Sequence, residues 1–226
     1  ANISRFSFSF VSGNTLYFVL ERTGGTQDLW YSDGTAAGTK LIAGSARFDF
    51  HDSYLTAGGA LYFQSFDKTT GKSGFFRTDG KTTKLLKEGL NIFETSFGGG
   101  VAIGNKLVFT GSLRNPDPNG ISDIELFITD GTAGGTKLLK NILPNDSSIP
   151  GSYFSNGARA YFSVSGKLWT TDGTSAGTKA VGDLPAPGQV TFSGDTLYFA
   201  APEAGVYRVK GAAPAGKVLL KEYFVS

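Results

Sequence analysis

The chain has 226 residues, and its 21 basic and 19 acidic side chains are too balanced for the concentrated positive field that nucleic acid binding requires. It has no cysteine and one histidine, His51, which excludes disulfides and metal sites built from thiolates or several histidines. No apolar run reaches the length of about 18 residues needed to cross a bilayer, so no membrane span is expected.

A motif built around Asp-Gly-Thr recurs along the chain and defines five repeats. The copy at 29–42 returns almost intact at 126–139 and 168–181, in shortened form at 75–86 and in worn form at 206–211. A period of about 40 to 50 residues is typical of solenoids, propellers and arrays. Glycine and aromatic residues abound and no segment has helical spacing of apolar residues, so strands are expected and almost no helix.

Each repeat is predicted to hold four antiparallel strands. In the first repeat, the segment 6–11 alternates at period two and is followed by a Gly-Asn turn, which tolerates positive φ. Next come a Leu-Tyr-Phe strand at 16–18, a Leu-Trp strand at 29–30 and, after the Asp-Gly-Thr turn, a strand at 39–42. The first strands of the later repeats are expected at 53–56, 100–103, 152–154 and 189–192.

Four antiparallel strands make one propeller blade. The sequence therefore predicts an all-β fold: a single five-bladed β-propeller over 1–226, with blades at approximately 1–44, 45–88, 89–142, 143–183 and 184–226. Five blades are expected to close a ring. Pairing of residues 1–4 with 222–225 would remove an exposed strand edge, and the sequence leaves open whether it occurs.

The pattern Leu-Trp-x-x-Asp-Gly-Thr-x-x-Gly-Thr, preceded by Leu-Tyr-Phe, resembles the bacterial ELWxxDGT repeat family over nearly the whole chain. The family's leading Glu is present only as Glu125, and Lys210 replaces the Asp in the fifth repeat. The resemblance implies a secreted or surface β-propeller and no reaction. The chain starts at Ala1 without methionine, which fits removal of a secretory signal and equally fits a trimmed chain.

The carboxylates of the Asp-Gly turns have two interpretations. They are either a ring of acids that binds something at each blade or caps that accept hydrogen bonds from their own turn amides. The second is favoured, because Asp before Gly-Thr fixes a hairpin. The residues are Asp33, Asp79, Asp130 and Asp172.

Aromatic residues at equivalent strand positions also have two interpretations, namely packing between blades or stacking platforms for a sugar ring. Trp30 and Trp169 occupy one such position, where other repeats carry Phe or Tyr. The tyrosines of the Leu-Tyr-Phe strands lie on the face opposite their neighbours, where hydroxyls could line clefts between blades. They are Tyr17, Tyr62, Tyr161 and Tyr198.

The loop at 115–123 resembles the first half of a calcium loop. Oxygen-bearing side chains stand at positions one, three, five and nine, with glycine at position six. The ligands would be Asn115, Asp117, Asn119 and Asp123. Position twelve is Leu126 in place of a closing acid, so the alternative is an ordinary polar loop. No other cofactor is predicted.

The sequence predicts a non-enzymatic protein. The acids nearest to a first strand, Asp49 and Asp52, flank His51 on one strand and would not flank a glycosidic bond. Repetition favours several equal pockets, which gain avidity on a multivalent surface. The predicted function is therefore an extracellular, lectin-like module that binds glycans, with a structural or adhesive surface module that binds protein or matrix as the alternative. The ligand and the oligomeric state stay open.

Overall fold

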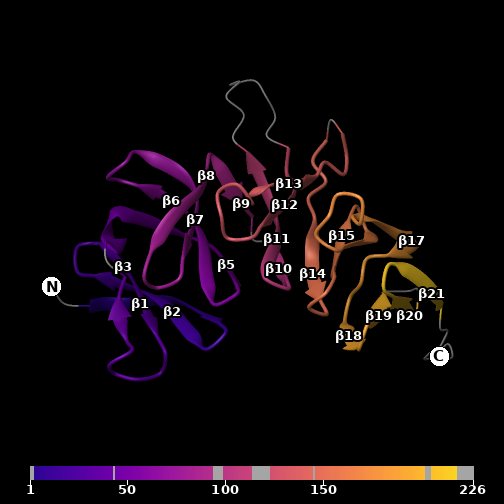
Figure 1. Cartoon of the computed structure of the whole chain (residues 1–226), viewed down its shortest axis with the longest axis horizontal. Helices are drawn as coiled ribbons and strands as arrows, with labels where there is room; N and C mark the ends of the chain where they lie inside the picture. The colour runs from indigo at the N-terminus through magenta and orange to yellow at the C-terminus, as the bar shows by residue number, and fades with distance from the viewer. Residues whose placement is uncertain are drawn as a thin grey trace, which may run out of the picture.

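The structure is a computed structural model that describes residues 3–42, 44–93, 99–113, 123–144, 146–201 and 205–217. Within these ranges every regular element is a β-strand except η1 (Ser45–Arg47), a single 3-10 turn. The strands form five antiparallel sheets, each made of strands consecutive in the chain (Figure 1). The predicted all-β fold is confirmed.

The first two sheets each contain four strands. Sheet A comprises β1 (Ile3–Ser12), β2 (Thr15–Arg22), β3 (Gln27–Ser32) and β4 (Lys40–Leu41). Sheet B comprises β5 (Phe48–Ala57), β6 (Ala60–Asp67), β7 (Lys72–Thr78) and β8 (Thr83–Glu88).

The middle sheet, sheet C, has a fifth strand that the sequence did not predict. It comprises β10 (Gly100–Ile103), β11 (Lys106–Leu113), β12 (Glu125–Thr129) and β13 (Lys137–Lys140), and β9 (Leu90–Ile92) pairs with β11. The long β11 runs past the end of β10, so β9 occupies the edge that β10 leaves free.

The last two sheets again contain four strands each. Sheet D comprises β14 (Gly151–Ser155), β15 (Ala160–Val164), β16 (Lys167–Thr171) and β17 (Lys179–Pro185). Sheet E comprises β18 (Val190–Ser193), β19 (Thr196–Ala201), β20 (Gly205–Lys210) and β21 (Ala213–Lys217).

The two faces of each sheet carry different side chains, because residues alternate along a strand. We call the face toward the preceding sheet the front face and the face toward the following sheet the rear face. In sheets A and E, the same names are given to the faces with the equivalent strand positions. A cross-strand aromatic pair marks each front face, with ring centroids 5.0–6.5 Å apart. The pairs are Phe18–Trp30, Phe63–Phe76, Phe109–Phe127, Phe162–Trp169 and Phe199–Tyr207.

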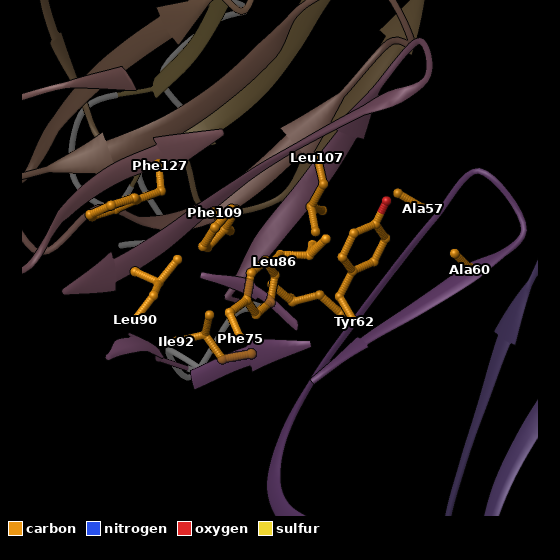
Figure 2. Close-up of a cluster of buried hydrophobic side chains, with 11 residues drawn as sticks. Ala57, Ala60, Tyr62, Phe75, Leu86, Leu90, Ile92, Leu107, Phe109 and Phe127 are labelled. Atoms are coloured by element: carbon orange, nitrogen blue, oxygen red, sulfur yellow. The ribbon is translucent and has the colours of Figure 1, made fainter. Parts of the chain in front are cut away.

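The core lies between sheets as four apolar clusters, one for each pair of consecutive sheets. Figure 2 shows the cluster between sheets B and C, where Tyr62, Phe75 and Leu86 meet Phe109 and Phe127. The rings of Phe75 and Phe109 lie 4.8 Å apart. Since burial of one such side chain contributes about 1.5–3 kcal/mol, each cluster holds its two sheets together strongly.

The five sheets follow one another without returning to the start. The first strands lie side by side, since β5 contacts both β1 and β10, and β10 contacts β14. Figure 1 places sheet A and sheet E at opposite ends of the long axis. Among the described residues, these two sheets do not meet to close the ring expected from the sequence. The pairing suggested for 1–4 with 222–225 involves residues outside the described ranges.

In sheets B, C and D, the glycine of the Asp-Gly turn packs on the rear face of the preceding sheet. A Cβ on Gly80 would lie 3.0 Å from the Tyr31 ring, and a Cβ on Gly173 would lie 3.0 Å from Ile103 Cδ1. The equivalent Gly34 of sheet A has nothing within 4 Å of such a Cβ. These turns therefore take part in the interface between sheets wherever a preceding sheet is present.

We predict that Gly80→Ala lowers the free energy of unfolding more than its matched control Gly34→Ala. Both glycines have left-handed φ, +86° and +91°, so a side chain costs about 1–3 kcal/mol of strain at either position. Only at Gly80 must the Tyr31 ring also move away. Urea denaturation of the two variants in dilute solution measures the difference, and equal losses would contradict a packing role for this turn.

Candidate functional site

The Asp-Gly-Thr turns of sheets A, C and D share one hydrogen-bond pattern. In sheet A, Asp33 Oδ1 accepts bonds from the Thr35 N–H at 2.9 Å and from the Thr35 hydroxyl at 2.7 Å. The Thr35 hydroxyl oxygen accepts a bond from the Gly38 N–H at 2.9 Å. The turns of Asp130 and Asp172 repeat these bonds at 2.7–3.0 Å. Each carboxylate thus binds its own turn.

A second pair of hydroxyls closes the base of each turn. Thr39 donates to the Thr35 carbonyl at 2.7 Å, and its hydroxyl lies 2.7 Å from that of Ser32. Because the Thr39 proton is used on the carbonyl, the Ser32 hydroxyl donates to Thr39. Sheets C and D repeat the pair as Thr129–Thr136 and Thr171–Thr178, all buried. Sequence reasoning missed these pairs, although the spacing of Ser or Thr seven residues apart was visible.

The second glycine of the motif is a steric requirement. A Cβ on Gly38, Gly135 or Gly177 would lie 1.9–2.0 Å from Oδ1 of the Asp in the same turn. No side chain fits there while the Asp keeps its bonds to the threonine. The spacing Asp-Gly-Thr-x-x-Gly-Thr therefore encodes one closed hydrogen-bonded loop.

The turn of sheet B departs from the pattern because it is shorter. Asp79 Oδ1 accepts bonds from the N–H groups of Lys81 at 3.1 Å and Thr82 at 2.9 Å, and Arg77 lies 3.4 Å from its other oxygen. The shortened motif still uses its Asp to cap the turn.

The turn carboxylates are held in their ionised form. Hydrogen bonds from the side chain and backbone of Thr35 lower the pKa of Asp33, and those of Thr132 do the same for the pKa of Asp130. The Thr174 hydroxyl lowers the pKa of Asp172. For Asp79, partial burial opposes the change, but the N–H groups of its turn outweigh it and lower the pKa. At neutral pH these acids are acceptors and not proton donors.

Three of the four tyrosines singled out from the sequence are buried between sheets. The Tyr17 hydroxyl donates to the Gly59 carbonyl of sheet B at 2.8 Å, and the Tyr161 hydroxyl donates to the Gly211 carbonyl of sheet E at 2.6 Å. Tyr62 belongs to the cluster between sheets B and C. Burial raises the pKa of all three hydroxyls, to about 12 for Tyr17. The three hydroxyls remain protonated at neutral pH, and the tyrosines stabilise the interfaces between sheets.

The remaining aromatic candidates occupy different surroundings. Trp169 is half-buried and packs with Phe162 in the cluster between sheets C and D. Trp30 and Tyr198 are half-buried on the two end sheets, Trp30 on the front face of sheet A and Tyr198 on the rear face of sheet E. The structure does not bring these side chains together into one pocket.

Three of the four proposed calcium ligands, Asn115, Asp117 and Asn119, lie outside the described residues, whereas Asp123 is described and half-buried. Among the described residues, no group of three or more His, Cys, Asp or Glu side chains is placed to hold a metal ion. Calcium binding at this loop stays a prediction.

Glu125 has a role that sequence reasoning did not assign. Its buried carboxylate accepts bonds from the Ser148 hydroxyl at 2.6 Å and the Ile142 N–H at 3.0 Å. It thereby ties the start of β12 to the segment after β13. The signal was the leading Glu of the repeat motif, but its partners lie 17 and 23 residues away in the chain.

The acids near His51 do not form a described catalytic pair. Asp49 forms an ion pair with Lys68, and the side chains of His51 and Asp52 lie outside the described part of the chain.

No helix among the described residues is long and apolar enough to cross a membrane.

Neither a protein-family model nor a curated protein matches this sequence. Solved structures do resemble the fold. A puromycin-hydrolysing peptidase of Mycobacterium tuberculosis has a TM-score of 0.55 and 17% identity, over 91% of this chain and 37% of that chain. A structure from a study of two prolyl endopeptidases has a TM-score of 0.54 and 10% identity, over 94% of this chain and 35% of that chain.

The β-propeller domain of the Trilobed protease from Pyrococcus furiosus is also similar, with a TM-score of 0.46 and 17% identity over 90% of this chain and 67% of that one. At these identities the likeness concerns the fold alone. Five antiparallel sheets packed face to face in chain order make a propeller-type arrangement. The chain spans little more than a third of each of the two peptidases.

The predicted lectin-like function is wrong, and so is its adhesive alternative. Two solved structures that resemble this fold are of peptidases, and neither is described as a glycan-binding protein. The structure gives a physical reason: three of the four tyrosines expected to line equal pockets are covered by the following sheet. Repetition here serves the contacts between sheets, so it is no argument for repeated ligand sites.

Adjacent glycines of one turn provide a test of the steric requirement. We expect Gly135→Ala to destabilise the protein by about 1–3 kcal/mol, because its Cβ displaces the Asp130 carboxylate and breaks a closed set of hydrogen bonds. Gly134→Ala is the matched control, since its Cβ meets nothing within 4 Å. Thermal and urea unfolding report both, and a harmless Gly135→Ala would refute the proposed loop geometry.

The stabilising effect of Asp130 is expected to depend on pH. Its pKa is lower in the folded state, so its carboxylate stabilises the fold above the unfolded pKa of about 3.9, and this contribution is lost as pH falls through the folded pKa. Asp130→Asn keeps an acceptor oxygen but no charge. The stability difference between wild type and this variant should therefore shrink between neutral and acidic pH. A constant difference in urea midpoints across that range would exclude this role for the charge.

Proposed function

We propose that the chain is a non-catalytic propeller domain of five blades that works together with a peptidase-type hydrolase domain. The observation that carries this proposal is the pattern of coverage. More than nine-tenths of this chain aligns with the two peptidases at TM-scores above 0.5, yet it accounts for only 37% and 35% of their lengths. The aligned part would then be the propeller, and the rest would supply the reacting groups.

The chemistry of the repeated side chains supports a role without catalysis. The turn carboxylates are ionised and bound to their own threonines, so they are poor general acids at neutral pH. The interface tyrosines Tyr17 and Tyr161 are protonated and donate to backbone carbonyls of the next sheet. Both sets of groups are used in contacts within the fold. The domain would therefore act by binding through its surface.

The first test asks whether the isolated chain reacts. The purified protein is incubated with fluorogenic aminoacyl and prolyl peptides and, separately, with a fluorophosphonate probe that labels active serine hydrolases. We expect no release of fluorophore and no label on the chain. Turnover, or probe attached to a serine of this chain, would show that the domain is itself catalytic.

The second test asks whether a hydrolase binds. The folded chain serves as bait in an extract of the source organism treated with the same probe, and the urea-unfolded chain serves as the control for capture by exposed apolar segments. We expect a probe-labelled hydrolase to be retained by the folded bait alone. Retention of no labelled protein, or equal retention by both baits, would contradict the pairing with a hydrolase.

A further inference from the structure

The four interfaces within the chain repeat one contact. In each, the aromatic pair on a front face packs on the rear face of the preceding sheet. Phe63 and Phe76 of sheet B meet Tyr17 of sheet A, and Phe199 and Tyr207 of sheet E meet Tyr161 of sheet D. Within the described part of the chain, sheets B to D therefore use both faces, whereas sheets A and E use one face each.

Sheet A leaves its front face unmatched. Its aromatic pair, Phe18 and Trp30, is half-buried, whereas Phe63 and Phe76, the same pair in sheet B, are buried. Phe6 stacks on Phe18 at 5.8 Å and is 56% exposed. This face is an exposed copy of a surface that is covered elsewhere in the chain.

The described residues place no further sheet on the rear face of sheet E. Tyr198, which is equivalent to Tyr17 and Tyr161, lies there beside an open hollow of about 270 Å³. Thr191, Ala200 and Val206 also line this hollow. A front face of the kind found on sheet A would place aromatic rings against such a surface.

We propose that the front face of sheet A binds the rear face of sheet E on a second copy of this chain, head to tail. The two faces are the separated halves of a contact made four times inside each chain, so their pairing continues an established interface. They lie at opposite ends of the long axis, so another copy brings them together without rearrangement of the fold (Figure 1). Such a contact is heterologous, so it builds a ring or an open chain of copies. It does not depend on the proposed function.

The test uses one variant for each face of the intact chain. Phe6→Asp places a charge on the front face, and Ala200→Asp places one on the exposed rear face; both positions lie at the surface. Leu41→Asp is a second front variant, for which Leu138→Asp is the matched control. Both leucines are exposed, at 40% and 44%, and pair with a front-face aromatic residue, but Leu138 belongs to the middle sheet. Circular dichroism and urea midpoints establish that each variant is folded.

We expect the wild type and Leu138→Asp to rise in mass with concentration in light scattering and sedimentation velocity, whereas the other three variants stay monomeric. An equimolar mixture of Phe6→Asp and Ala200→Asp should form dimers and nothing larger, because it contains one intact pair of faces. A monomeric wild type at all concentrations would overturn the proposal, since closure within the chain or cover by another segment would then satisfy these faces. Self-association that the face variants do not change would overturn it as well.

Discussion

The burial of an aromatic pair between consecutive sheets is the interaction on which the rest of this structure depends. A four-stranded sheet alone buries neither face, and its apolar side chains gain free energy only when another sheet covers them. Each cluster joins the rear face of one sheet to the front face of the next. The order of sheets in space therefore follows their order in the chain.

The Asp-Gly-Thr turn connects this packing to local chemistry. Hydrogen bonds to the Asp carboxylate close the turn, and in sheets B to D the left-handed glycine that follows the Asp packs against the preceding sheet. In sheet B that contact is with the Tyr31 ring, and in sheet D it is with Ile103. The repeated acidic motif therefore stabilises its own hairpin turn and also forms part of the interface between sheets.

The sequence predicted those features that depend on neighbouring residues. Alternation and turn residues are local signals, so the strands around Leu16 to Phe18 and the turn at Asp33 could be placed before the structure was known. β9 could not, because three residues form a strand there only where β11 offers a free edge. The partners of Glu125 were hidden for the same reason, since they come from distant segments.

The failed functional prediction has an equally specific cause. Alternation places Tyr17 on one face of its strand, but it does not reveal whether another sheet covers that face. The lectin interpretation treated the tyrosine positions as open, and the structure covers Tyr17, Tyr62 and Tyr161 with the next sheet. Only Tyr198 differs, because no sixth sheet follows it among the described residues.

The ends of such an array are its least stable parts. In repeat architectures stability is approximately the sum of each unit and its neighbour contacts, so a sheet with one neighbour opens more readily than a sheet with two. Sheet A adds a second weakness, since its outer strand β4 has only two residues, whereas the equivalent β13 has four. A partner that covers an end sheet binds the folded form alone and therefore stabilises it. Association and folding of the end sheets are coupled for that reason. The kind of aromatic pair that joins the middle sheets also determines how strongly a partner stabilises the end sheets.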